Sequence, residues 1–391
     1  MADRRGRTAA ILPGARSSRA PAVSCASCLA RPSLLATRTP VRATMLPMFR
    51  PRSLPTAMAG VAATVGALLA SAALAGPAAA HGLVPAEPPS LASLALGWTF
   101  EPLPTLALLI SIGWWLWAVR RVDAAHPAHP VPRRRTVAFM LGMLAIAFAL
   151  LSGIARYDTV LFSVHMVQHV LLMLVAAPLI AMSAPVTLLL RVSSVETRRR
   201  WWLPALHSRL MRTLAHPVVA WVLFTSIVWA THFSALFNAS LEDPFVHQIE
   251  HILFLTGALL FWWPAVALDP TSWRMSHPAR IGYTFLQMTQ NTFLAVVLLN
   301  ASGVLYPHYA SVIRSWGPVA LDDQHLAAGI MWIIGDIVFL TAILALFAGW
   351  MRAETRDSNR ADRWADAERV QIRIRERRLA QRLSEERGER P

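Results

Sequence analysis

The chain alternates between long apolar blocks and short connectors that are rich in arginine. A helix needs about 20 apolar residues to cross the roughly 30 Å hydrocarbon core of a bilayer. The blocks that approach this length predict an all-α, polytopic transmembrane helix bundle with seven spans, at residues 103–119, 136–155, 160–190, 217–237, 247–267, 281–303 and 325–350. The third block contains Pro178 and Pro185, so we expect this helix to bend or end early there.

Composition and charge agree with this interpretation. Hydrophobic residues make up 55% of the 391 residues, and the mean hydropathy is +0.44. The formal net charge of +15 could indicate a nucleic-acid partner. The arginines, however, lie beside the apolar blocks and form no separate basic domain. We therefore expect the lipid bilayer, and no nucleic acid, to be a partner of this chain.

Residues 1–80 read as an N-terminal extension followed by a signal peptide. Met45 begins a short basic segment, which leads into an Ala/Leu/Val-rich run and then into GPAAA, ending at Ala80. This order is typical of a secretory signal peptide, so we predict a start at Met45 and cleavage after Ala80. A retained first helix is the alternative. Cys25 and Cys28 form a CASC motif that could bind metal or do redox work, but cleavage would leave the mature chain without cysteine.

The distribution of arginine predicts how the spans are oriented. Connectors 120–135, 191–216 and 268–280 carry thirteen arginines, whereas the connectors on the other side, 81–102, 156–159, 238–246 and 304–324, carry only Arg156 and Arg314. Arginine-rich loops stay in the cytoplasm. We therefore predict a transmembrane domain over residues 81–350 with its N-terminus outside and its C-terminus in the cytoplasm.

The last segment, residues 351–391, is strongly charged. It contains twelve arginines and nine acids, many of them three or four residues apart, as Arg373 and Glu376 are. This spacing favours a solvated cytoplasmic helix with ion pairs along its surface. A role in binding a partner is the alternative.

Histidines gather near the outer ends of four predicted spans. Two pairs have the spacing H-x-x-x-H, which places both rings on one helix face. Another histidine lies about 15 residues into the fourth span, roughly 22 Å across the membrane from the cytoplasmic face. The set comprises His165, His169, His232, His247, His251 and His325. Ionisable groups in a span are costly and normally face the bundle interior.

This clustering predicts a metal site. One buried histidine is most often a hydrogen-bonded packing residue, but two H-x-x-x-H pairs at matched depth favour metal ligands. Imidazole suits Zn, Cu, Fe and Ni, and thioether adds a preference for Cu(I), which makes Met166 and Met288 further candidate ligands. Without mature cysteine, the choice narrows to copper, or to haem held between helices.

Several other polar residues lie within or beside the spans. Gln168, Glu250, Gln287 and Asp336 place polar atoms inside the predicted bundle, and an intramembrane carboxylate such as Asp336 suggests a partner for a histidine or a role in proton balance. Cleavage after Ala80 would also make His81 the N-terminal residue. Its amine and imidazole could then bind Cu(II) on the outer face.

The most specific block of the sequence follows the motif H-M-x-Q-H, followed by P-L and APxxLLL. It occurs here at His165, Met166, Gln168, His169, Pro178, Ala184 and Pro185. Together with the H-x-x-x-H of the fifth span, this block resembles the CtaG-type cytochrome c oxidase assembly factors of bacteria, over residues 85–350.

The resemblance implies a non-enzymatic factor of the bacterial inner (plasma) membrane. Its partners would be subunits of a haem–copper cytochrome c oxidase, with copper delivery to the oxidase as its role. Two other functions remain open from the residues. One is a haem-binding membrane redox protein, a haem-handling oxidoreductase with histidines from different helices as axial ligands. The other is a copper transporter, in which Met288 and Asp336 would continue the path inward.

Overall fold

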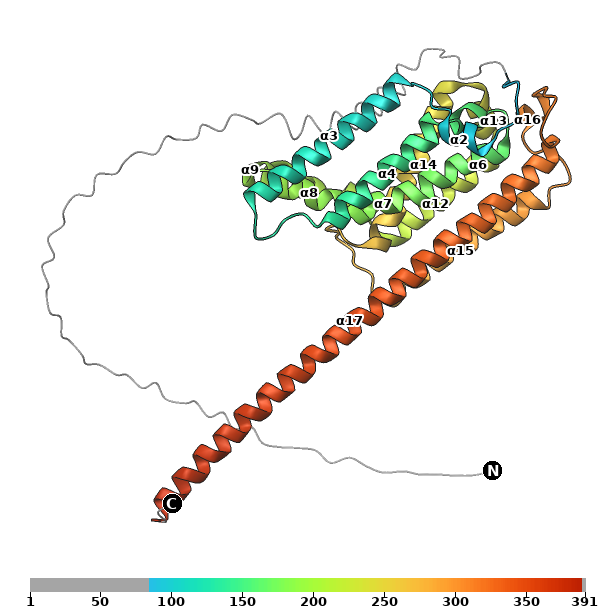
Figure 1. Ribbon diagram of the computed structural model, residues 1–391. Coiled ribbons are helices and arrows are strands. Elements are labelled where there is room, and N and C mark those ends of the chain that lie inside the picture. Colours follow the sequence, from blue (N-terminus) through green and yellow to red (C-terminus); the bar gives the residue numbers. More distant parts are fainter. Residues whose placement is uncertain (1–83, 389–391) are drawn as a thin grey trace, which may run out of the picture. The chain divides into compact units, whose positions relative to one another are not determined.

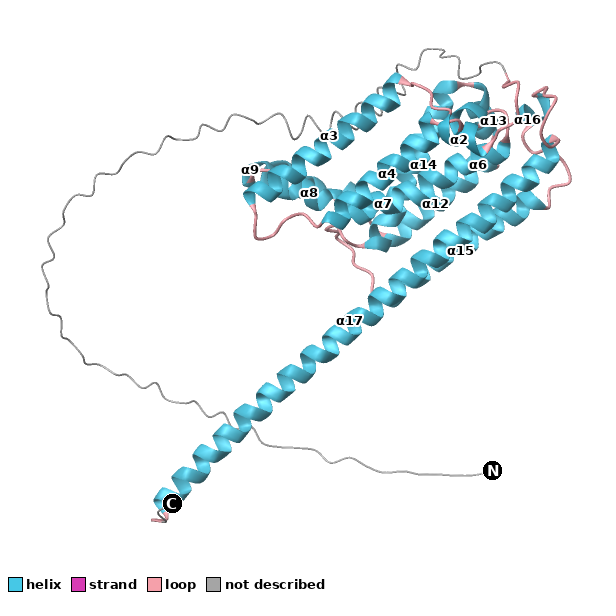
Figure 2. Cartoon of the chain, in the orientation of Figure 1, coloured by secondary structure: helices cyan, strands magenta, loops and turns pink. Residues whose placement is uncertain are grey.

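The computed structural model describes residues 84–388, and every regular element in this range is a helix (Figures 1 and 2). The all-α prediction is therefore confirmed for this part of the chain. The signal peptide, its cleavage after Ala80, the CASC motif and His81 lie outside the described residues.

Five helical segments of the described chain are long and apolar enough to cross a membrane: Pro102–Ala125, Arg133–Tyr157, Phe162–Val192, Pro244–Val266 and Ala320–Glu386. A sixth span results if α12 (Pro217–His232) and α13 (Ala235–Glu242), which meet at a bend of 69°, are taken together. The predicted count of seven is not confirmed.

The predicted sixth span corresponds to α15 (His277–Leu299), which is long enough to cross a membrane but not apolar enough to count among the candidate spans. Polar residues such as Arg280, Gln287, Gln290 and Asn291 lower the hydropathy of this helix. It nevertheless packs along α17 (Ala320–Glu386), and Figure 1 shows the two helices side by side.

The remaining helices build the rest of the bundle and its connections. Their bounds are α2 Leu91–Leu96, α3 Pro102–Ala125, α4 Arg133–Leu151, α5 Ile154–Tyr157, α6 Phe162–Val170, η2 Leu171–Ala176, α7 Ala177–Ser183, α8 Pro185–Val192, α9 Val195–Thr197, η3 Arg198–Trp202, α10 Leu203–Leu206, α11 Arg209–Leu214, α14 Pro244–Val266 and α16 Pro307–Ser311. The main core forms where α6 packs on α17 and where α14 packs between α12 and α7.

The third predicted span is interrupted, as its prolines predicted. A π-helical turn, η2, precedes Pro178, which lacks the amide hydrogen for a regular helical bond. Further on, Ala184 adopts a left-handed conformation (φ 58°) and Pro185 begins α8. Asp269 stabilises this restart, because its carboxylate accepts hydrogen bonds from the backbone amides of Val186 (3.1 Å) and Thr187 (2.6 Å).

Side chains also define both ends of α14. At its start, the Asp243 carboxylate accepts a 2.8 Å hydrogen bond from the Phe245 amide, and Pro244 occupies the first turn. At its end, the Arg280 guanidinium donates to the carbonyl oxygens of Ala265 (2.6 Å) and Val266 (2.8 Å). A cation at these carbonyls complements the helix dipole, so the helix that carries His247 and His251 is held at each end.

Helix α17 extends far beyond the bundle, as Figure 1 shows. Its residues 351–386 are almost all exposed. Asp366 and Arg369 form an ion pair of 3.1 Å on this surface, with side chains more than two-thirds exposed. Such an exposed pair contributes at most about 1 kcal/mol to stability. The helical conformation of this segment therefore depends mainly on its backbone hydrogen bonds.

Candidate metal centre

Five of the six predicted histidines lie together at one end of the bundle. His165 and His169 are on α6, His247 and His251 on α14, and His232 is the last residue of α12. The ring centroids are separated by 4.2 Å for 165–169, 5.3 Å for 165–247, 4.3 Å for 247–251, 6.4 Å for 169–251 and 6.5 Å for 169–232. We call these five residues the histidine cluster.

The cluster is shielded from solvent. All five side chains are buried, and His165 and His169 have no exposed surface. The ring of Phe237, from the bent helix α13, packs over His165 at 5.1 Å and over His232 at 5.5 Å between centroids. On another side, Phe254 packs against His169 at 4.5 Å. Aromatic rings therefore surround the imidazoles with an apolar shell.

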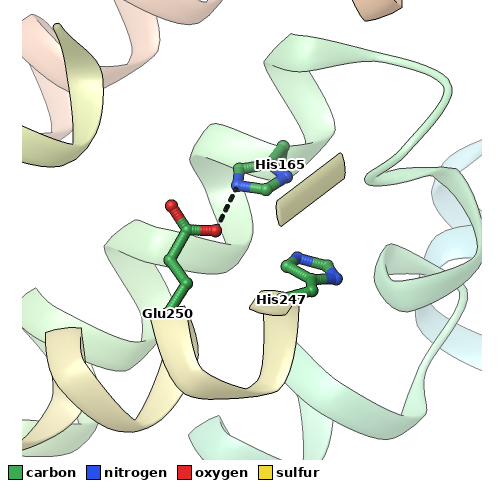
Figure 3. Close-up of side chains that lie close together, drawn as sticks. All are labelled: His165, His247 and Glu250. Atoms are coloured by element: carbon green, nitrogen blue, oxygen red, sulfur yellow. Dashed lines mark ion pairs between the residues drawn. The ribbon is translucent and has the colours of Figure 1, made fainter. Parts of the chain in front are cut away.

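A buried carboxylate completes the group. Glu250 lies on α14, one turn from His247, and its Oε2 atom is 3.9 Å from Nε2 of His165 (Figure 3). His165, His247 and Glu250 each offer one potential ligand atom, and these three atoms lie within 4.8 Å of one another. Figure 3 shows both imidazoles and the carboxylate around a common space. A single ion could be held between them.

The polar atoms of this group are poorly satisfied by the protein itself. Neither ring nitrogen of His165 or His169 makes a hydrogen bond, and neither Glu250 oxygen accepts a well-formed one. Buried polar atoms are almost always hydrogen-bonded, and leaving one unpaired costs about 1–3 kcal/mol. Buried imidazoles without well-formed hydrogen bonds, one of them 3.9 Å from a buried carboxylate, therefore fit residues that bind a cation.

Gln168 determines which nitrogen of His251 is available. Its Nε2 donates both hydrogens, to the Ala149 carbonyl (2.9 Å) and to the Asp158 carboxylate (2.9 Å), so its Oε1 must be the acceptor facing His251 Nε2 at 3.0 Å. His251 therefore carries its proton on Nε2. Its Nδ1 is left as a lone pair with no hydrogen-bond partner, which is the form in which imidazole binds metal.

His232 is fixed in the opposite tautomer. Its Nδ1 lies 2.8 Å from the carbonyl oxygen of Val228, which can only accept, so the proton is on Nδ1. The lone pair is then on Nε2, which has no hydrogen-bond partner. The Tyr306 hydroxyl donates to the His232 carbonyl at 3.2 Å and so ties this helix end to the loop before α16.

The other predicted site residues make their hydrogen bonds outside the cluster. His325 is half-buried on α17, and its Nε2 contacts the Ala301 carbonyl at 3.2 Å. Asp336 accepts from the Thr292 hydroxyl at 3.0 Å, and Gln287 accepts from the Thr225 hydroxyl at 2.9 Å. No ring contact joins His325 to the five clustered histidines among the described residues.

The two methionines predicted as ligands occupy different surroundings. Met166 is buried and lines a small cavity together with His232. Met288 is half-buried on α15, packs against the main core and is not among the residues that line this cavity. The geometry thus separates two candidates that composition alone treated alike.

Sequence reasoning missed two carboxylates that support the cluster. Asp323 on α17 accepts from the Phe162 amide (2.6 Å) and the Ser163 hydroxyl (2.5 Å), which caps the helix carrying His165. Asp158 accepts from Gln168, and burial raises the pKa of this carboxyl to about 7 despite the lowering effect of that bond. Only contacts across 10 and 160 residues reveal these roles.

As a set, the side chains suit a metal ion. The bare nitrogens of neutral imidazoles bind Cu, Zn, Fe or Ni, and one carboxylate supplies a balancing negative charge. Donors from α6 and α14 approach one space, so packed helices hold them in place without any loop. The arrangement can bind and release a cation, and no group in it is set up as a nucleophile next to a base.

Comparison with known proteins gives a family for this chain. The family model for the cytochrome c oxidase caa3 assembly factor (Caa3_CtaG) matches residues 113–353, which include the whole histidine cluster. No solved structure shows significant similarity.

The curated relatives are mycobacterial. The chain is 32% identical over 290 residues to the uncharacterized proteins Mb0105 of Mycobacterium bovis and MT0111 of Mycobacterium tuberculosis, and 31% identical over 289 residues to ML1998 of Mycobacterium leprae. Each match covers 72% of this chain but only 43% of the relative, so the chain spans less than half the length of these proteins. The match of the family model over more than half of the sequence shows that this chain belongs to the caa3-type cytochrome c oxidase assembly factor family.

Proposed function

We propose that this protein helps to assemble a haem–copper cytochrome c oxidase in the bacterial plasma membrane by holding copper as cargo in the histidine cluster. The family supports the assembly role. The observation that carries the copper proposal is the fully buried imidazole of His165, whose ring nitrogens make no well-formed hydrogen bond, 3.9 Å from the buried carboxylate of Glu250. An assembly factor needs no catalytic step, and we assign none.

The orientation inferred from arginine places the cluster in the outer leaflet. Helices α6 and α14 carry their histidines in their first two turns, and α12 ends at His232, so all five rings lie at the end opposite to the arginine-rich connectors. With the C-terminus in the cytoplasm, copper would be offered to an oxidase subunit at the outer side of the membrane.

The ligand set suits an ion that is passed on. Its converging donors come from two helices, and H-x-x-x-H pairs allow one imidazole to leave while its neighbour on the same face remains bound. Glu250 can offset part of the charge of a bound cation, which lowers the cost of holding that cation in a low-dielectric interior. Transfer of copper to a partner requires that the ion bind tightly and that its ligands leave one at a time.

Analysis of the purified protein tests the proposal. We expect copper to copurify or to bind stoichiometrically, and His165→Ala or His169→Ala to reduce both copper content and assembled oxidase activity without removing the protein from the membrane. His207→Ala is the matched control, because this exposed histidine lies outside the bundle core. Wild-type oxidase activity and oxidase copper in both cluster variants would contradict the proposal.

The purified protein also tests the two alternative functions, a haem-binding redox protein and a copper transporter. A haem protein would show a Soret band, but the three closest ring pairs, with centroids 4.2, 4.3 and 5.3 Å apart, are already in contact and leave no space for a porphyrin between them. A transporter would take up copper into vesicles that contain this protein alone. We expect neither a Soret band nor uptake.

A further inference from the structure

A second space, largely apolar but with a few polar side chains in its lining, lies deeper in the bundle than the histidine cluster. It is a cavity of about 30 Å³ enclosed by α6, η2, α12, α15 and α17. Its lining includes Met166, Met173, Met331 and His232. Met166 and Met173 follow His165 by one and by eight residues on the descending third span, so the cavity continues inward from the cluster. A space of this size holds a single ion or one or two water molecules.

The imidazole of His232 is available to this cavity. Its side chain is 3% exposed, its Nδ1–H is committed to the Val228 carbonyl, and its Nε2 lone pair has no hydrogen-bond partner. Val228 also lines the cavity. A buried, bare nitrogen at an enclosed space indicates a missing partner, which would be either a donor such as water or a metal ion.

The other lining residues favour a soft monovalent ion. Three of them are methionines, whose thioethers select Cu(I) over harder cations. Among residues 84–388, no carboxylate lines the cavity, so none of them would offset the charge of a divalent ion there. The cluster above differs in this respect, because Glu250 lies beside its imidazoles.

Two of the three amide side chains at the cavity, those of Gln287 and Asn291, make contacts elsewhere, and the third is that of Gln290. Gln287 Oε1 accepts from the Thr225 hydroxyl at 2.9 Å, and Asn291 Nδ2 donates to the Met331 carbonyl at 3.1 Å. Both residues line the cavity. These bonds leave the thioethers and the His232 lone pair as its soft donors.

We propose that this cavity is a second copper position, selective for Cu(I), with Met166, Met173, Met331 and His232 as its donor set. It is distinct from the position in the histidine cluster, where His165, His247 and Glu250 approach one another. The inference rests on the proposed copper function and extends it, because it assigns two ions of different chemistry to one chain. His232 lines the inner cavity, and its ring lies 6.5 Å from that of His169 in the histidine cluster.

The test is a Cu(I) titration of the full chain in detergent, under anaerobic reducing conditions and against a chromophoric Cu(I) chelator. We expect wild-type protein to bind two Cu(I) ions. The double variant Met173→Leu/Met331→Leu should bind one, with the sulfur signal in copper X-ray absorption lost or strongly reduced. Leucine preserves most of the volume of methionine, so the variant should fold.

Two controls separate the two positions. Met288→Leu changes a methionine that does not line the cavity, so it should still bind two ions. Glu250→Gln combined with His165→Ala should lose the outer ion and keep the ion with sulfur ligands. Met166→Leu is an independent inner variant, and we expect it to weaken Cu(I) binding at the inner position at least tenfold.

Each result has a definite meaning. One copper ion in wild-type protein, unchanged in the double methionine variant and lost with His165→Ala, would overturn the inner position and leave the proposed function intact. One ion with sulfur ligands, lost only in the methionine variants, would support the inner position and contradict the proposed outer one. No copper in wild-type protein would overturn both.

Discussion

The amide oxygen of Gln168 lies 3.0 Å from Nε2 of His251, and this contact joins α6 to α14 inside the histidine cluster. Because the amide nitrogen of Gln168 is held by Ala149 and Asp158, the glutamine cannot rotate without breaking both bonds. The proton of His251 is thereby placed on the nitrogen facing Gln168. In the motif H-M-x-Q-H, the glutamine thus positions a histidine of the other H-x-x-x-H pair.

Replacing Gln168 should weaken metal binding without removing a ligand. In Gln168→Leu, His251 loses the acceptor that fixes its tautomer, and the Asp158 carboxylate loses a donor. Loss of such a supporting bond typically costs 10–100-fold in metal affinity, and we expect a decrease in copper affinity within this range, measured by chelator competition. Gln248→Leu, at a half-buried glutamine also on α14, is the control. Equal affinities in the two variants would refute this role of Gln168.

Asp158 should make the stability of the protein depend on pH. Burial raises the pKa of this carboxyl from 3.8 to about 7, so the folded protein binds the proton more tightly than the unfolded chain does. The contribution of this group to stability is therefore greatest below about pH 4, falls as pH rises toward 7, and levels off above that. At about 1.4 kcal/mol for each pKa unit, the total loss is roughly 4 kcal/mol.

Thermal unfolding in detergent between pH 4 and pH 8 measures this effect. Asp158→Asn retains an oxygen that can accept from Gln168 but cannot ionise, so its melting temperature should fall less with rising pH than that of wild-type protein. The difference between the two profiles isolates Asp158 from other titrating groups. Parallel profiles across this interval would show that the carboxyl does not titrate there.

Asp323 should matter far more than its neighbour Asp322. Both lie in the first turn of α17, but Asp322 is exposed whereas Asp323 is buried and caps α6. Asp323→Ala would leave the Phe162 amide and the Ser163 hydroxyl without their acceptor, at a cost of about 2 kcal/mol. Asp322→Ala should cost less than about 0.5 kcal/mol. Each variant removes one negative charge from the first turn of α17, so the difference between their melting temperatures excludes the effect on the helix dipole.

Much of this architecture could be predicted from periodicity and charge. The long apolar blocks predicted the helices, Pro185 predicted the break before α8, and the two H-x-x-x-H motifs with His232 predicted which histidines could meet. These features depend on the local sequence, or on how far along a helix a residue lies and therefore how deep in the membrane we expect it to be. His325 shows the limit of depth as a criterion, because it lies near an outer helix end and yet contacts the Ala301 carbonyl.

The supporting residues could not be predicted because their partners are distant in sequence. Asp323 and Ser163 are 160 residues apart, and nothing in either local sequence indicates the contact. The rotation of each helix about its axis also decides which residues share a space. This rotation brings Met166 to the cavity with His232 and places Met288 elsewhere, although both are methionines inside apolar helices.

A final prediction concerns the close approach of α15 and α17 beside the inner cavity. A Cβ atom added at Gly335 would lie 2.5 Å from Nδ2 of Asn291, which lines that cavity and donates to Met331. Gly335→Ala should therefore displace Asn291 and destabilise the protein by about 1–3 kcal/mol. Gly329→Ala on the same helix meets no atom within 4 Å and should stabilise the protein by about 0.5–1 kcal/mol, because alanine favours the helix. Melting temperatures that shift in opposite directions would establish this contact, and equal shifts would disprove it.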